Sequence, residues 1–237
     1  MKTIVIIPTL NEEKNIKKIV NRVVKANSKY NILIIDDESS DNTIGVIKKN
    51  FKKNKKIKLI SRKKNKGLGS AHRDGLLYSY KKKYDYCVTI DADGTHDPEK
   101  IKVMLDKLKK NSSIHIINTS RFMKSESLED WPMSRKLLTY VRYYLVKILL
   151  NSKLDSSGGF RAYKLSKIKK KHLLKAKNHN YFFLIESLYY FEKLNYNIVD
   201  IPIKLKFRNA DQSKMKIEHI LDSFFSIVKL SLQKFNG

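Results

Sequence analysis

The sequence lacks the features that mark secreted or membrane-spanning proteins. Cys87 is its only cysteine, so no disulfide can form within the chain. No apolar run approaches the roughly 20 residues of a membrane-spanning helix, and the apolar stretch near the N-terminus is too short for a signal peptide. Repeats and low-complexity linkers are also missing. These absences predict a globular cytoplasmic protein that is either soluble or peripheral at the cytoplasmic face of a membrane.

Acidic residues are scarce as well. The 237 residues include 23 Asp and Glu against 50 Lys and Arg, which gives a formal charge of +27, and 42 of the basic residues are lysines. The lysines are spread along the chain, so the charge is either solvated surface without a specific partner or an attraction to anionic lipid or nucleic acid. The sequence has no helix-turn-helix, zinc or RNP pattern, which argues against nucleic acid as a partner.

What the chain does contain is a regular alternation of apolar strands and amphipathic helices in its first half. Strands are predicted at 2–8, 30–37, 56–62, 84–93 and 113–121, with helices between them at 12–27, 42–51, 67–82 and 97–110. Continuous apolar strands between helices indicate a parallel sheet covered on both faces. We therefore expect an α/β protein with a Rossmann-like, mostly parallel sheet.

The second half is less regular. A loop is predicted at 122–133 and an apolar helix at about 137–150; a strand at 158–165, a helix at 181–194, a strand at 196–207 and a last helix at 216–235 follow. The two apolar helices are amphipathic, and packing against the core is the default for both. The alternative is that one of them lies on a bilayer or on a membrane partner.

Polar side chains follow five of the predicted strands. In an open α/β sheet, ligands bind beyond the carboxyl ends of the strands. The residues found there are Pro8, Asn11, Glu12, Asp36, Asp37, Arg62, Asp91, Asp93 and Arg121. No dinucleotide fingerprint follows the first strand, and no phosphate-binding P-loop occurs. The glycine-rich segment at 67–75 is interpreted as a tight turn that lets a helix begin close to the sheet.

The acidic segment after the fourth strand predicts a metal site. Asp91 and Asp93 can share a divalent cation, because Mg²⁺ and Mn²⁺ prefer oxygen ligands and Mg²⁺ is commonly completed by substrate phosphates. Such an ion would bridge the carboxylates to a nucleoside diphosphate and stabilise its charge as it leaves. Asp97 is interpreted instead as a helix N-cap. His96 is either a structural hydrogen-bonding group or a ligand of the metal or substrate.

Eight short motifs occur in a fixed order: "IPTLNEEKNI", "IIDDESSDNT", "R-x4-GLGSAHRDG", "DADGTHDPEKI", "SR", "WPMSRKLL", "SGGFRAY" and "IPIKLKFRNADQSKM". Together, over about residues 3–216, they resemble family 2 glycosyltransferases of the GT-A fold, and more narrowly the polyprenyl- (dolichyl-)phosphate mannose synthases. The resemblance implies one GT-A domain over 1–237. Its nucleotide-sugar half would be 1–121, and its acceptor-side half 122–237, which ends in an amphipathic helix.

The resemblance also implies roles for individual residues. Catalytic roles fall to Asp93, Arg121 and Arg135, and a divalent cation, Mg²⁺ or Mn²⁺, is expected on Asp91 and Asp93. Donor binding is implied for Pro8, Asn11, Glu12, Asp36, Asp37, Asp91, Ala92, Arg208 and Lys214. Within these sets, Asp36 and Asp37 would contact base and ribose, and the phosphates would meet Arg121, Arg135, Arg208 and Lys214. The sequence departs from the family pattern at Leu10, Glu38, Thr95 and Thr119, and Thr95 leaves the third metal ligand open.

The distribution of arginine favours these phosphate contacts. Most of the eight arginines lie in the motif segments, namely Arg62, Arg73, Arg121, Arg135, Arg161 and Arg208. Only Arg22 and Arg142 fall in plain helices. A planar guanidinium that binds phosphate through two hydrogen bonds cannot be replaced by lysine. The alternative explanation is chance combined with packing on helix surfaces.

The implied reaction is the inverting transfer of a hexose onto a polyprenyl or dolichyl monophosphate, and the resemblance favours mannose from GDP-mannose. The acceptor phosphate is largely dianionic at neutral pH and needs no general base. The alternatives are UDP-glucose or a UDP-N-acetylhexosamine as donor, or a sugar hydroxyl as acceptor, for which Glu186 and Asp155 are the candidate bases. A membrane surface or a membrane-anchored subunit is the expected partner.

Overall fold

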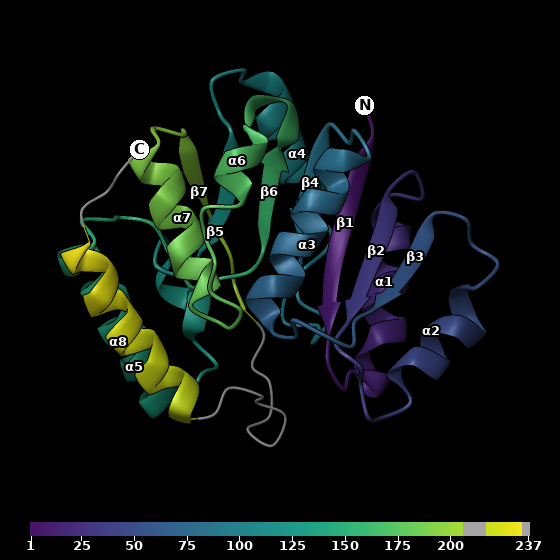
Figure 1. The fold of residues 1–237 in the computed structure, drawn as a ribbon, viewed down its shortest axis with the longest axis horizontal. Helices are drawn as coiled ribbons and strands as arrows, with labels where there is room; N and C mark the ends of the chain where they lie inside the picture. Colours follow the sequence, from purple (N-terminus) through teal and green to yellow (C-terminus); the bar gives the residue numbers. More distant parts are fainter. Residues whose placement is uncertain (206–216, 234–237) are drawn as a thin grey trace.

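The computed structural model of the protein describes residues 1–205 and 217–233. Within them, one seven-stranded sheet has the order β3-β2-β1-β4-β6-β5-β7 (Figure 1). The strands are β1 (Thr3–Thr9), β2 (Asn31–Asp36), β3 (Ile57–Ser61), β4 (Tyr86–Thr89), β5 (Ile116–Ser120), β6 (Arg161–Lys164) and β7 (Ile198–Pro202). Strand β6 runs antiparallel to β4 and β5, and the other pairs are parallel. The predicted α/β, mostly parallel sheet is therefore confirmed.

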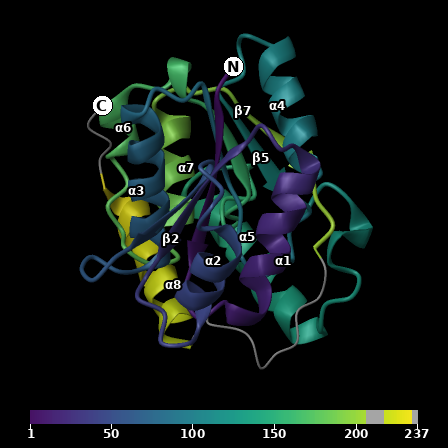
Figure 2. The ribbon, with the colours of Figure 1, turned by 90° about the vertical axis from the view of Figure 1, so that its right-hand side faces the viewer.

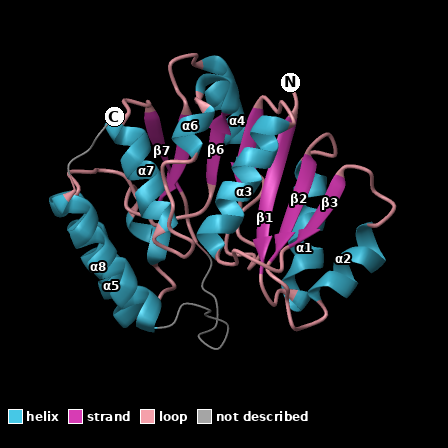
Figure 3. Cartoon of the chain, viewed as in Figure 1, coloured by secondary structure: helices cyan, strands magenta, loops and turns pink. Residues whose placement is uncertain are grey.

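Helices cover both faces of this sheet (Figures 2 and 3). One face packs against α1 (Glu13–Ala26), α2 (Thr43–Phe51) and α4 (Lys100–Lys110). The other packs against α3 (Leu68–Lys81), α6 (Lys170–Leu173), α7 (Phe183–Lys193) and the short 3-10 turn η2 (Leu165–Lys167). Because helices lie on both sides, every residue of β1 is buried.

Two further helices form a separate layer at one end of the sheet. Helices α5 (Met133–Leu149) and α8 (Ile217–Leu232) lie side by side, at the left in Figure 1, and pack on α7. Their shared cluster includes Val146 of α5, Ile185 of α7 and Ile227 of α8. Helix α5 begins a turn earlier than predicted, immediately after Pro132, and the predicted loop before it contains the 3-10 turn η1 (Ser125–Leu128). Among the described residues, no helix combines the length and apolarity that a membrane crossing requires.

The chain after β4 departs from the prediction in a way that matters for the site. Strand β4 ends at Thr89, so the acidic segment that follows is a loop rather than strand. Helix α4 is assigned from Lys100, with Glu99 at the cap position. Asp97 lies just before this start and behaves as predicted, because its carboxylate accepts a hydrogen bond from the backbone N of Glu99 at 3.3 Å and its carbonyl accepts from that of Lys100 at 3.1 Å. The same carboxylate accepts a hydrogen bond from Arg22 Nη2 at 2.7 Å. The loop is thereby fastened to α1.

Candidate active site

A cavity of about 880 Å³ lies at the carboxyl ends of the parallel strands, between the sheet and helices α5, α7 and α8. This size is at the upper end of the usual range for small-molecule sites. The predicted site residues that line it are Pro8, Glu12, Asp37, Asp91, Ala92, Asp93, Arg121 and Arg135. Asn11 and Asp36 are not on its wall. Arg208 and Lys214 lie outside the described residues.

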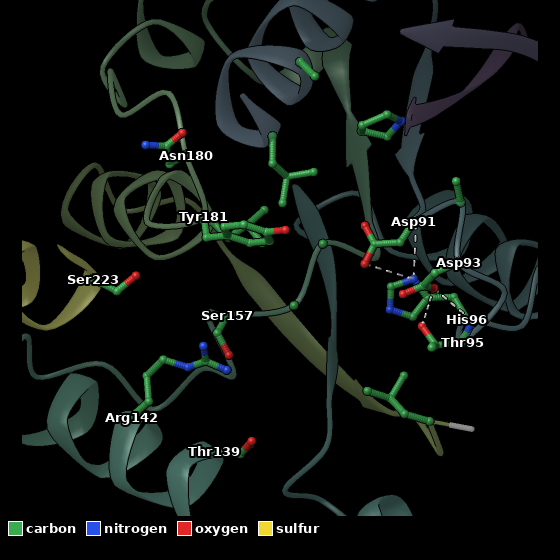
Figure 4. A pocket seen from close by; sticks show the side chains of 18 of the residues that line it. Asp91, Asp93, Thr95, His96, Thr139, Arg142, Ser157, Asn180, Tyr181 and Ser223 are labelled. Atoms are coloured by element: carbon green, nitrogen blue, oxygen red, sulfur yellow. Dashed lines mark hydrogen bonds and ion pairs between the residues drawn. The ribbon is translucent and has the colours of Figure 1, made fainter. Parts of the chain in front are cut away.

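Asp91 and Asp93 sit on a tightly fixed loop at one side of the cavity (Figure 4). Asp93 Oδ1 accepts hydrogen bonds from the backbone N of Thr95 at 3.0 Å and from its hydroxyl at 2.8 Å. The backbone N of Asp91 donates to His96 Nδ1 at 3.3 Å. The His96 ring is buried and lies 5.1 Å from the ring of Phe160, centroid to centroid. These contacts support the structural interpretation of His96, and they show that Thr95 orients Asp93.

The donor set at this loop fits a divalent cation that a substrate helps to hold. Asp91 and Asp93 both line the cavity. No group of three or more His, Cys, Asp or Glu side chains in the described part of the chain is placed to hold a metal ion by itself. Mg²⁺ is characteristically bound through one or two carboxylates with the remaining ligands from water and substrate phosphates. Two carboxylates facing a large cavity match that pattern.

Behind Asp91, sequence reasoning missed two residues, Gly159 and His72. A Cβ atom added at Gly159 would lie 2.9 Å from Asp91 Oδ1, so the Asp91 carboxylate would have to shift, whereas His72 Nε2 would be in ordinary contact at 3.5 Å. His72 is buried, and no hydrogen-bond partner among the described residues reaches its Nε2. Burial, reinforced by the charge of Arg161, lowers the pKa of His72 to about 3, so its ring is neutral. The glycine pair in the "SGGFRAY" motif was the available signal.

Asp36 and Asn11 hold the loop after β2 rather than facing the cavity. Asp36 is fully buried and accepts hydrogen bonds from the hydroxyls of Thr9 at 2.8 Å and Ser39 at 2.6 Å. Asn11 Oδ1 accepts from the backbone N of Ser40 at 2.8 Å. In this structure both side chains fix the backbone at the ends of β1 and β2, and their contacts with the nucleotide stay a prediction.

Asp37 does reach the cavity wall, in a buried ion pair. Its carboxylate accepts from Arg62 Nε at 2.8 Å, from Arg62 Nη2, and from the backbone N of Gly67 at 2.7 Å. Arg62 also donates to Asp74 at 2.8 Å. This network ties the start of α3 to the end of β2. Arg62 itself does not line the cavity.

Several motif arginines prove to hold the fold. Arg161 is 1% exposed and donates to Ser187 Oγ at 3.0 Å and to the carbonyl of Leu184 at 2.9 Å. Arg73 donates to the carbonyl of Lys177 at 3.1 Å. With Arg62, they show that arginine in a motif segment is a weaker guide to phosphate contacts than the sequence suggested.

Arg121 lines the cavity but is strongly engaged. Its Nε donates to Asp155 Oδ2 at 2.8 Å, and its Nη2 donates to Asp155 Oδ1 at 2.5 Å and to the hydroxyl of Ser157. Burial favours the neutral form of Asp155, yet the charge and hydrogen bonds of Arg121 outweigh burial and hold the pKa of Asp155 below its ordinary value. Asp155 is thus the buried partner of Arg121 and is unsuited to act as a general base.

Glu186, the other candidate base, is also structural. It lies on α7, outside the cavity lining, and accepts hydrogen bonds from the backbone N of Lys177 at 3.0 Å and of Asn178 at 2.8 Å. Burial raises the pKa of Glu186. Its carboxylate fixes the segment before α7. The cavity is therefore lined by arginines and by the two carboxylates of the acidic loop, Asp91 and Asp93. Neither of the two candidate bases, Asp155 and Glu186, is available to act as a general base in it.

Comparison with known proteins agrees with this geometry. Residues 4–171 match the model of the family described as "Glycosyl transferase family 2". The chain is 28% identical to the polyprenol monophosphomannose synthase of Mycolicibacterium smegmatis, over 98% of this chain and 88% of that protein. It is 32% identical to the UDP-N-acetylglucosamine–dolichyl-phosphate N-acetylglucosaminyltransferase of Methanococcus voltae, over 84% of this chain and 83% of that protein.

Among solved structures, the fold resembles glucosyl-3-phosphoglycerate synthase from Mycobacterium tuberculosis in complex with Mn²⁺, UDP and glucosyl-3-phosphoglycerate. The TM-score is 0.62 at 18% identity, over 97% of this chain and 79% of that one. That similarity supports the fold, and the family match spans well over half of the chain. With Asp91 and Asp93 at the strand ends, the conclusion follows that the chain belongs to glycosyl transferase family 2 and is a glycosyltransferase of the GT-A fold.

Proposed function

We propose that the protein transfers a hexose from a nucleoside diphosphate sugar to a polyprenyl phosphate, and that the donor is GDP-mannose. One observation carries the proposal: a single cavity joins the carboxylates of Asp91 and Asp93 to a wall that is both cationic and apolar. The carboxylate side suits a metal-bridged diphosphate. The opposite wall, with Arg135 and Leu138 from α5 and Phe224 from α8, suits a phosphate attached to a hydrocarbon chain.

The reaction needs little proton transfer from the chain. An oxygen of the acceptor phosphate forms the new bond to the anomeric carbon, while the bond from that carbon to the donor diphosphate breaks and the nucleoside diphosphate leaves with the electron pair. Attack opposite to the leaving group inverts the anomeric configuration. A divalent cation held by Asp91 and Asp93 would supply positive charge to the leaving diphosphate. Arginine side chains on the facing wall orient the acceptor phosphate and offset repulsion between the two anions.

A second donor class has specific support. The Methanococcus voltae relative is named for UDP-N-acetylglucosamine, and the similar solved structure holds UDP. Thermal unfolding with GDP, UDP, CDP and dTDP, each with Mn²⁺, separates these possibilities, because a ligand that binds only the native state stabilises it by roughly 2.7 kcal/mol at 100 times its Kd. We expect the largest rise in Tm with GDP, and transfer from GDP-mannose to farnesyl phosphate in preference to UDP-sugars. A larger rise with UDP would move the protein to the second donor class.

The metal assignment is tested by Asp93→Asn. This change removes a charged oxygen ligand while keeping the hydrogen-bond acceptor for Thr95. We expect transfer activity to fall by roughly 10²-fold or more, together with loss of the Mn²⁺-dependent part of the GDP-induced rise in Tm. Asp97→Asn is the matched control, because Asp97 belongs to the same loop but pairs with Arg22. Near wild-type turnover in Asp93→Asn would show that the metal lies elsewhere.

Exposed apolar side chains support a peripheral location at a membrane. Helix α5 leaves Leu137 63% and Ile148 73% exposed, and Phe225 of α8 is 67% exposed. A lipid-linked acceptor would be presented at a bilayer surface. Contact of α5 and α8 with that surface would bring the apolar wall of the cavity to the lipid.

A further inference from the structure

Helix α5 contributes two arginines to the cavity, and only one of them belongs to a motif. Arg142 follows Arg135 by seven residues and Thr139 by three, a spacing that puts all three on one face of a helix. All three line the cavity. Figure 4 shows Arg142 projecting from α5 into the cavity on the same side as Thr139, away from Asp91 and Asp93.

Arg142 is half-buried, and its Nε is shut off from water. Among the side chains that the structure describes, no hydrogen bond reaches that nitrogen. Among the described residues, Asp155 is the carboxylate whose charge acts on Arg142, and Arg121 already engages it through two nitrogens. Within that part of the chain, Arg142 therefore has no carboxylate of its own.

The pKa of Arg142 reflects that setting. Burial, and then the positive charge of Arg121, lower it to about 10 against the opposing effect of Asp155. Arg142 therefore remains charged at neutral pH. A partly buried cation without a carboxylate of its own lowers the stability of the folded protein, so the contacts among the described residues do not account for its presence.

The other described arginines make the contrast clear. Arg22, Arg62, Arg73, Arg121 and Arg161 each donate at least one hydrogen bond to another part of the chain. Arg135 instead lies with its guanidinium carbon 6.0 Å from the ring centroid of Trp131. In the part of the chain that the structure describes, the two α5 arginines on the cavity wall are thus the cations left for a ligand.

The surroundings of Arg142 indicate what kind of anion it would take. Leu138 and Leu145 of α5 and Ile227 of α8 line the same side of the cavity, so an anion bound there would have an apolar group next to it. A donor diphosphate bridged by a cation to Asp91 and Asp93 would occupy the other side. The chemistry that fits is a phosphate monoester on a hydrocarbon chain, since guanidinium groups bind phosphate oxygens through paired hydrogen bonds.

We propose that Arg142 anchors the phosphate of the acceptor, together with Arg135 and Thr139 on the same face of α5. The inference rests on the proposed function, because it takes the acceptor to be a lipid phosphate. It adds a binding residue from outside the sequence motifs. It also gives a reason why a second arginine lies beside the Arg121–Asp155 ion pair, which among the described residues is complete without it.

The test measures binding without transfer, so it does not depend on the donor. Trp131 is the only tryptophan and lines the cavity, so its fluorescence reports occupancy. Farnesyl phosphate, farnesol and inorganic phosphate are titrated into the wild type, Arg142→Met and Arg142→Lys. Lys147→Met is the matched control, because Lys147 lies on the same helix outside the cavity lining. Binding of GDP with Mn²⁺ and Tm are recorded for each protein.

We expect Arg142→Met to weaken farnesyl phosphate binding at least about tenfold while leaving farnesol and GDP binding unchanged, and its Tm to stay level or rise, because a partly buried charge without a carboxylate of its own is removed. The affinity of Arg142→Lys for farnesyl phosphate should lie between those of the wild type and Arg142→Met, and the affinity of Lys147→Met should equal that of the wild type. Inorganic phosphate should bind far more weakly than farnesyl phosphate, which assigns the site to an amphiphile rather than to free phosphate.

Two results overturn the inference and leave the proposed function standing: equal farnesyl phosphate affinity in wild type and Arg142→Met, or a lower Tm in Arg142→Met, which would mark a structural cation. A wild type that does not bind farnesyl phosphate at all would instead refute the proposed acceptor, and the inference with it. Phosphate-dependent binding through Arg142 combined with failure to use GDP-mannose would refute the donor alone.

Discussion

At the scale of single residues, the space behind Asp91 decides how the acidic loop is presented. Gly159 lies where any side chain would press on Asp91 Oδ1. The neighbouring Gly158 is different, because a Cβ atom there would meet only the carbonyl oxygen of Thr119 at 3.8 Å. Two adjacent glycines therefore serve different purposes, and the difference can be measured.

Gly159→Ala should impair catalysis more than folding. The new methyl group would displace the Asp91 carboxylate from the cavity wall, and a shift of about 1 Å at a reacting centre can reduce the rate roughly 10²-fold. We expect a lower kcat and a higher requirement for Mn²⁺. Gly158→Ala, the control, should retain activity, since 3.8 Å is an ordinary van der Waals contact. Equal activity of the two variants would mean that the position of Asp91 is not restricted from this side.

His72 should make the folded protein sensitive to acid. Its pKa of about 3 lies below the unfolded value of 6.5, so between these pH values the unfolded chain binds a proton that the folded protein does not. The contribution of His72 to the free energy of unfolding should therefore be fully present above about pH 6.5. It should fall by about 1.4 kcal/mol per pH unit as pH decreases through this window. Besides Phe183, the groups that act on the ring are Arg161 and His96.

Urea unfolding of wild type and His72→Leu at pH 7, 5 and 4 measures this contribution as the difference between the two proteins. Burial raises the pKa values of Glu186, Glu192 and Asp200, which acts in the opposite direction, but these groups are common to both proteins. The stability of His72→Leu should depend less on pH than that of the wild type. Parallel pH profiles would show that His72 is not buried in its neutral form.

Residue roles could be predicted from the sequence where they depend on strand order, and not where they depend on orientation. Asp91 and Asp93 were found because both follow the end of a buried strand. Asp36 also ends a strand, but its side chain points into the protein toward Thr9 and Ser39, which spacing alone does not reveal. Arg142 was assigned to a plain helix surface, since the face of α5 that meets the cavity is set by its packing on α7 and α8.

At the scale of elements, local periodicity predicted most helices and strands. Which strands pair with each other could not be read from the sequence and is known only from the folded structure. The residues of α1 that are buried recur at helical spacing, at Ile16, Ile19, Val20 and Val23. Strand β6 was predicted as a strand, but nothing in its four residues states that it inserts antiparallel between β4 and β5. That insertion brings Gly159, which precedes the strand, to the back of Asp91. The active-site loop therefore depends on contacts between segments far apart in the sequence.

Helix α5 has two different faces, one directed into the protein and one exposed. Thr139, Arg142 and Val146 face inward, toward the cavity and α7. The exposed apolar residues of the helix that lie outside the cavity lining include a stripe at helical spacing, formed by Leu137, Tyr144 and Ile148. A contiguous exposed apolar patch often marks an interaction surface. The predicted packing of this helix against the core therefore holds for only one of its faces.

At the scale of the whole molecule, the proposed membrane association predicts that the net charge and the exposed stripe act together. A charge of +27 attracts the protein to an anionic bilayer, but this attraction is screened beyond about 8 Å at physiological salt. Apolar burial is independent of salt to first order. A protein that uses both should bind anionic membranes strongly at low salt and retain part of its binding at high salt, whereas nonspecific charge attraction alone would disappear.

Replacing Leu137 and Ile148 together by serine separates the two contributions. Both side chains are exposed and lie outside the cavity lining, so folding and the turnover of soluble farnesyl phosphate should be unchanged. Each leucine or isoleucine that enters lipid contributes up to roughly 1.5–3 kcal/mol, so co-sedimentation with anionic liposomes in about 0.5 M salt should fall at least about tenfold. Val103→Ser on α4 is the control, because Val103 is 50% exposed but lies on another helix. If both variants and the wild type sediment alike, or if the wild type fails to sediment at low salt, α5 is not the membrane-facing element and the acceptor must reach the cavity from another side.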